Sequence, residues 1–158
     1  MSATGLDVFD KTIQTTNIWL DEIMVSIGPD RQTAWKVLST VLHKLRDRLP
    51  LDLSAHLAAQ LPLLVRGVYY DLYEPAKQPS GLATGEEFVE EVAKWLSDTR
   101  LVDPKDAIKA VFQVLGRHVS QGEIAKVRAA LPQGIRALWT AEPVLEPSSA
   151  ASPSPLPT

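Results

Sequence analysis

Two short stretches of the sequence decide the fold: LPLLVR at residues 61–66 and LPQGIR at residues 131–136. Each contains a Leu-Pro step with an arginine four residues after the proline. Proline has no backbone N–H and disfavours the helical conformation of the residue before it, so a helix ends at each step. Proline is well tolerated in the first turn of a new helix. Each stretch therefore predicts a helix that ends and a short helix that begins.

Helical periodicity extends outward from both steps. In the first segment, apolar residues recur at the spacing of one helix face, at Phe9, Ile13, Leu20, Ile23 and Ile27. Residues suited to helix N-caps precede the later apolar stripes: Asp30, Asp103, and the capping-box patterns Thr84–Glu87 and Ser120–Glu123. No stretch alternates polar and apolar residues for long enough to predict a strand with confidence. The pattern predicts an all-α protein.

The two halves of the chain match in order around the Leu-Pro steps. The corresponding positions include Trp19 and Trp95, Asp30 and Asp103, Ala34 and Ala107, Val41 and Val114, Leu61 and Leu131, and Tyr69 and Trp139. We therefore expect a helical bundle of two repeated units, each with about three longer helices and a short one after the Leu-Pro break. The expected single domain spans residues 1–142, with repeats at about 6–73 and 84–140. Residues 143–158, rich in Pro, Ser and Ala, predict a disordered tail.

Composition excludes several classes of protein. A net charge of −3 disfavours nucleic-acid binding and docking on anionic lipid. The absence of cysteine removes disulfides, thiolate nucleophiles and Cys-ligated metals. No apolar run reaches the roughly 18 residues of a membrane-spanning helix, and the N-terminus has no secretory pattern. The chain is expected to be cytoplasmic, with no membrane contact.

Longer strings resemble a known family. In the first half these are VLH (41–43), LRDRLP (45–50), HLAAQLP (56–62) and LVRGVYY (64–70). In the second half they are VFQVL (111–115), RHVS (117–120), GEI (122–124), VR (127–128) and LP (131–132). They resemble the bacterial domain of unknown function 2267 family over roughly residues 9–139. The resemblance implies a compact α-helical domain and no established reaction, substrate or cofactor.

The sequence carries no recognisable catalytic motif. The HExxH, Gly-x-Ser-x-Gly, GxGxxG and GxxxxGK[ST] patterns are absent. Among the three histidines, His43 and His56 lie on successive expected helices and form a weak candidate for a metal site. Their spacing matches no defined metal motif, so polar residues at helix ends and interfaces are the favoured interpretation. The sequence therefore favours a non-enzymatic protein without a cofactor, and an enzyme would have to use an unrecognised arrangement of residues.

Basic residues recur at corresponding places in both halves. The pairs are Lys36 with Lys109, Lys44 with Arg117, and Arg66 with Arg136. One interpretation is that the aliphatic part of each side chain packs at the edge of the core while its charged group lies in water. The other is that the pairs form a symmetric docking surface for an acidic partner. The adjacent Tyr69 and Tyr70, if exposed, form a second candidate for partner binding.

These observations favour a non-enzymatic module. We expect it to bind another protein or to form a homo-oligomer, with the proline-rich tail as a tether. The alternative is a metal- or small-ligand-binding protein that uses histidines between helices.

Overall fold

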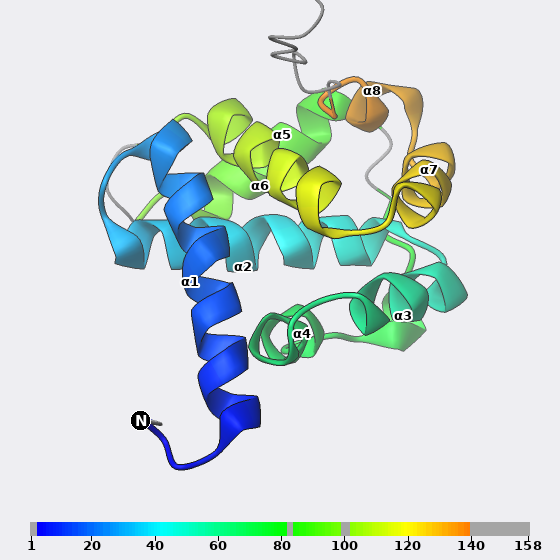
Figure 1. The fold of residues 1–158 in the computed structure, drawn as a ribbon. Coiled ribbons are helices and arrows are strands. Elements are labelled where there is room, and N and C mark those ends of the chain that lie inside the picture. Colours follow the sequence, from blue (N-terminus) through cyan, green and yellow to red (C-terminus); the bar gives the residue numbers. More distant parts are fainter. Residues whose placement is uncertain (1–2, 82–83, 99–101, 140–158) are drawn as a thin grey trace, which may run out of the picture.

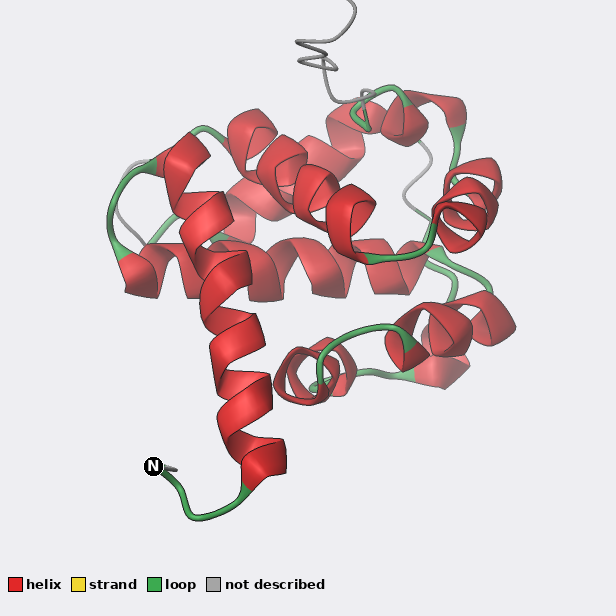
Figure 2. Ribbon diagram, in the orientation of Figure 1, coloured by secondary structure: helices red, strands yellow, loops and turns green. Residues whose placement is uncertain are grey.

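The computed structural model describes residues 3–81, 84–98 and 102–139. Figure 2 shows helices and loops, and no strand occurs in these ranges, so the predicted all-α class is confirmed. The helices are α1 (Asp7–Ile27), α2 (Arg31–Arg48), α3 (Leu51–Ala59), α4 (Leu63–Tyr70), α5 (Gly85–Trp95), α6 (Pro104–His118), α7 (Gln121–Ala130) and α8 (Gln133–Arg136), with a short 3-10 helix at Pro75–Lys77. The predicted tail, residues 143–158, lies outside the described residues.

The two central helices are α2 and α6. They contact each other, and each also contacts α1 and α5. In Figure 1, α1 crosses α2. The N-terminal half of α1 lies beside α4, and its first turns extend beyond the rest of the molecule. None of the helices in the described ranges has both the length and the apolar character needed to cross a membrane.

The core lies between these central helices. Its fully buried side chains in α2 and α6 include Val37, Leu38, Leu42, Leu45, Ile108, Val111, Phe112 and Leu115. Trp139 stacks on Phe112 with ring centroids 4.3 Å apart, which ties the end of the described chain to α6. Burial of each large apolar side chain stabilises the fold by about 1.5–3 kcal/mol relative to exposure.

Side-chain caps begin four of the helices, α2, α5, α6 and α7, at the residues that the sequence predicts. Asp30 accepts from Gln32 N–H at 3.0 Å, and Thr84 forms the full capping box with Glu87. At α7 the capping box is incomplete.

At α7, Ser120 Oγ accepts from Glu123 N–H at 3.3 Å, but Ser120 N–H donates to Gln60 Oε1 at 2.8 Å. The reciprocal bond predicted from Glu123 is therefore replaced by a side chain from the end of α3. This contact joins the ends of α3 and α7, two helices that also pack together.

At each Leu-Pro step, the arginine four residues after the proline donates hydrogen bonds to backbone carbonyls of the step. Arg66 donates from Nε to the carbonyl of Ala58 at 2.9 Å, and from Nη2 to the carbonyls of Ala59 and Leu61 at 3.2 and 3.0 Å. The last carbonyls of a helix have no partner within the helix, so these bonds satisfy groups that would otherwise need solvent.

The second step has the same set of bonds. Arg136 donates from Nε to the carbonyl of Arg128 at 2.9 Å, and from Nη2 to the carbonyls of Ala129 and Leu131 at 3.5 and 2.9 Å. Pro62 and Pro132 also have nearly equal backbone angles, with φ −55° in both. The contacts of the step thus recur, while the organisation of the whole chain as two repeats remains a prediction.

The apolar stripe of α1 is buried over only part of its length. Leu20 and Ile23 are buried in the body of the protein, but Phe9 and Ile13, which share the stripe, are 46% and 41% exposed. Helical periodicity identifies a face but not which turns of that face another element covers. The N-terminal turns of α1 therefore carry core-type residues on the surface.

Substitution of Leu61 tests the step. Leu61→Ala removes a buried side chain and is expected to lower the free energy of unfolding by about 2–5 kcal/mol, measured by urea denaturation. Leu63→Ala, at an exposed position two residues later, is the control and should change it by about 0.5 kcal/mol or less. Equal losses in the two variants would show that Leu61 is not part of the core.

Candidate functional site

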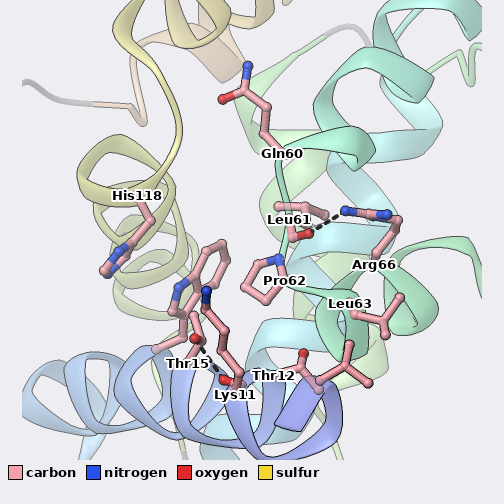
Figure 3. A pocket seen from close by; sticks show the side chains of 11 residues that line it. Lys11, Thr12, Thr15, Gln60, Leu61, Pro62, Leu63, Arg66 and His118 are labelled. Carbon is pink, nitrogen blue, oxygen red and sulfur yellow. Dashed lines mark hydrogen bonds between the residues drawn. The ribbon is translucent and has the colours of Figure 1, made fainter.

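A groove lies where α1 meets the first Leu-Pro step and the C-terminal end of α6. Its volume is about 380 Å³, and its walls come from α1, the α3–α4 junction and His118. Figure 3 shows Lys11 and Thr15 on one side, Pro62 and Arg66 on another, and His118 on a third. Ligand pockets in proteins have volumes of about 300–1,000 Å³, so this groove, which we call the α1–α4 groove, has room for a small molecule.

The groove is cationic. Lys11 and Arg66 contribute positive charges to its lining, His118 contributes an imidazole that contacts Glu22, and no aspartate or glutamate lines it. Lys11, Thr15 and Trp19 follow one another at intervals of four residues, which places them on one face of α1. The local sequence of α1 therefore supplies a cation, a hydroxyl and an aromatic ring to the same wall.

Trp19 and His118 form the aromatic part of the lining. Their rings stack with centroids 5.2 Å apart at an interplanar angle of 22°. Trp19 is only 1% exposed, and its indole N–H has no acceptor in the described part of the chain. Glu22 holds the imidazole in place, since His118 Nε2 lies 3.0 Å from Glu22 Oε2.

The wall formed by the Leu-Pro step is fixed by two contacts. Arg66 is held against the three carbonyls at the end of α3, so its positive charge stays at the edge of the groove. Leu64 N–H donates to Thr12 Oγ1 at 2.9 Å, which ties the first turn of α4 to α1. The first-turn N–H groups of a helix lack partners within the helix, so Thr12 completes the start of α4 from another element.

The predicted cations mostly have partners of their own. Lys36 pairs with Asp98, and Arg117 pairs with Glu22 at 2.9 Å. Lys109 is exposed on α6. Arg66 and Arg136 bond to helix-end carbonyls, which gives both a structural role, and their part in binding a partner remains a prediction.

Lys44 lies beside a second hollow of about 300 Å³, between α2 and the exit of α4. Its Nζ is 4.7 Å from the ring centroid of Trp95 and 3.2 Å from Glu91 Oε1. Arg46, in the same hollow, is buried and donates to the carbonyls of Tyr69 and Asp71, each at 2.7 Å. Lys44 and Arg46 already have acceptors, so this hollow offers a ligand fewer free donors than the α1–α4 groove does.

Tyr69 and Tyr70 are in different environments. Tyr69 is fully buried, and its hydroxyl donates to the Ser54 carbonyl at 3.0 Å and lies 2.8 Å from Ser54 Oγ. Burial raises the pKa of the phenol well above its usual range. Tyr70 is exposed next to it. The condition of exposure is therefore met by Tyr70 and not by Tyr69, because the stripe of α4 that includes Val65 places Tyr69 in the core.

The histidines proposed as metal ligands are in different environments. His43 Nε2 lies 2.7 Å from the carbonyl oxygen of Val68, whereas His56 is exposed on α3. Within residues 3–81, 84–98 and 102–139, no group of three or more His, Asp or Glu side chains is arranged to hold a metal ion.

The residues of the groove were not all identifiable from the sequence. Lys11 and Thr12 lie in no motif, and their role depends on the approach of α4, about 50 residues away in the sequence. His118 is at the end of α6, and its partner Glu22 is on α1. Contacts between distant segments of this kind leave no local pattern.

Comparison with known proteins identifies one family. A model of the family described as "Uncharacterized conserved protein (DUF2267)" matches residues 16–138, in agreement with the resemblance of the sequence strings. No curated protein sequence matches the chain. The matched range includes both Leu-Pro steps and most of the residues of the groove.

The pH dependence of stability tests the environment of His43. Burial lowers the pKa of His43 from 6.5, nearby Arg46 adds to this, and the Val68 carbonyl opposes it. Below about pH 6.5 the unfolded chain therefore binds more protons than the folded one, and this contribution to stability is lost as the pH falls. We expect His43→Gln to reduce the fall in unfolding free energy between about pH 7.5 and 5.5, measured by urea denaturation.

The exposed His56 provides the matched control. His56→Gln should leave the pH dependence as it is in the unmodified protein. If the unfolding free energy changes with pH equally in His43→Gln and His56→Gln, the pH dependence is not due to His43.

Proposed function

The chain belongs to the uncharacterized conserved protein family DUF2267, and we propose that it acts as an interaction module that pairs with a second copy of itself through α1. The observation that carries the proposal is the apolar face at the N-terminal end of this helix. We define the α1 apolar face as Leu6, Phe9 and Ile13, all exposed large hydrophobic residues.

The α1 apolar face is a continuation of the core stripe. Spacings of three and four residues place its members in line with Leu20 and Ile23, which are buried. An exposed stripe of this kind has the spacing that helices use to pack against one another. In Figure 1 the first turns of α1 extend beyond the rest of the molecule, so a second helix has access to them.

A second copy fits this face better than an unrelated charged partner does. In an antiparallel pair of α1 helices centred on residue 11, Phe9 of each copy lies opposite Ile13 of the other. Asp10 then lies opposite Thr12. The central residue, Lys11, lies about 160–200° around the helix from Phe9 and Ile13, so the two Lys11 side chains point away from the interface and no like charges meet within it. The face is thus self-complementary, which is what a two-fold interface requires.

The same helix carries exposed apolar residues on another side. Val25 is 88% exposed, and Ile18 is also exposed. At 100° per residue, both lie well away from the stripe that contains Phe9 and Ile13. They provide controls of similar chemistry that the proposed interface does not include.

Molar mass in solution tests self-association. Light scattering after size exclusion should give a mass that rises toward twice 17.3 kDa as the protein concentration increases. Ile13→Asp places a charge in the apolar interface and should give a monomer at the same concentrations, with an unchanged far-UV circular dichroism spectrum. Val25→Asp should still associate.

Two results would overturn the proposal. One is a monomeric unmodified protein up to several hundred micromolar, and the other is equal loss of association in the Ile13 and Val25 variants. If the protein is a monomer and binds a different protein through Leu6, Phe9 and Ile13, then that protein and not a second copy occupies the α1 apolar face.

A further inference from the structure

We propose that the α1–α4 groove binds a small organic anion with an apolar body. The site is separate from self-association, because Lys11, Thr15 and Trp19 lie on a different face of α1 from Phe9 and Ile13. Three features of the groove define its ligand: a cation with no carboxylate partner, an aromatic and apolar lining, and a limited volume.

The charge of the ligand follows from Lys11. In the described part of the chain, Lys11 has no carboxylate within 4.0 Å, as is also true of Lys109 and Lys126, and of these three only Lys11 lines the groove. In Figure 3 the Lys11 side chain rises from α1 into the groove, between His118 and Pro62. Arg66 adds positive charge at the edge, and no acidic side chain lines the groove to oppose an anion. The field inside the groove therefore favours a negative group.

A buried donor supports the presence of a ligand. The Trp19 indole N–H is buried and lacks an acceptor in the described residues, although Trp19 is part of the groove lining. Buried donors are almost always paired in folded proteins. The N–H has almost no accessible surface, so an acceptor beside Lys11 becomes its partner when the side chains that cover it shift.

The rest of the ligand is apolar and small. Leu61, Pro62 and Leu63 line the groove together with the Trp19 ring, and Figure 3 shows them across the groove from His118. The volume of about 380 Å³ is near the lower end of the range for small-molecule pockets. A short alkyl or single-ring body fills such a space, with its carboxylate or phosphate at Lys11.

The second Leu-Pro step has different surroundings from the first. There α8 packs against α5 through two glycines, so closely that a Cβ on Gly85 would lie 2.5 Å from the carbonyl oxygen of Gly134. The residue that occupies the place of Gly134 in the first step is Leu64, which is exposed and whose N–H donates to Thr12 Oγ1.

Titration with simple probes tests the site. The probes are hexanoate, hexyl phosphate and hexanol at millimolar concentration, followed by ¹H–¹⁵N correlation spectra of the full chain. We expect one or both anions to shift the Trp19 indole N–H and the amides of Thr15 and His118, and hexanol to leave them in place. The two anions distinguish a carboxylate from a phosphate head group.

Charge variants identify the anion-binding residue. Lys11→Gln should weaken binding of the anion about fivefold, because one direct charge contact near a surface is lost. Lys126→Gln, at an exposed position on α7, should leave the affinity unchanged. Ile13→Asp should also bind the anion normally, so a failure of self-association does not affect this result.

Three outcomes would overturn the proposal. These are no shift at the groove resonances with either anion, equal shifts with hexanol, and unchanged affinity in Lys11→Gln. Each is independent of the oligomeric state of the protein.

Discussion

The rest of the structure depends on the bonds between Arg66 and the end of α3. A Leu-Pro step breaks the helical hydrogen-bond ladder and leaves carbonyl groups without partners. Arg66 supplies donors to three of them from a single planar group, so the turn is fixed in one geometry. Hydrogen bonds from a charged group contribute about 1.5–3 kcal/mol each, which is enough to hold a helix of only eight residues in place. Arg136 forms the equivalent bonds at the second step.

The position of α4 decides what α1 presents to solvent. Because α4 begins against Thr12, one side of α1 becomes the wall of the cationic groove. The turns that carry Phe9 and Ile13 extend beyond the body and keep their apolar side chains exposed. The ligand site and the self-association face therefore have a common origin in the contact between α1 and α4, and they use different faces of one helix.

The sequence predicted what local chemistry controls. Asp30 and Thr84 begin helices as expected, and both Leu-Pro steps end one helix and begin another. The sequence could not show the direction of long polar side chains or the extent of coverage by distant segments. Arg66 was expected at the surface, yet its head bonds to helix-end carbonyls, and the sequence left the exposure of Tyr69 open, whereas the structure places it in the core. Lys11 gained its place in the groove only through the approach of α4, a long-range contact with no pattern in the sequence.

Amide hydrogen exchange in Arg66→Met tests the central role of this arginine most directly. Methionine keeps an apolar stem but has no donors for the carbonyls of the step. We expect the protected amides of α4 to exchange at least about tenfold faster, while those of α6 keep their rates. Arg136→Met should have the corresponding effect on α8. Unchanged exchange in α4 would contradict the account, because the position of α4 would then not depend on Arg66.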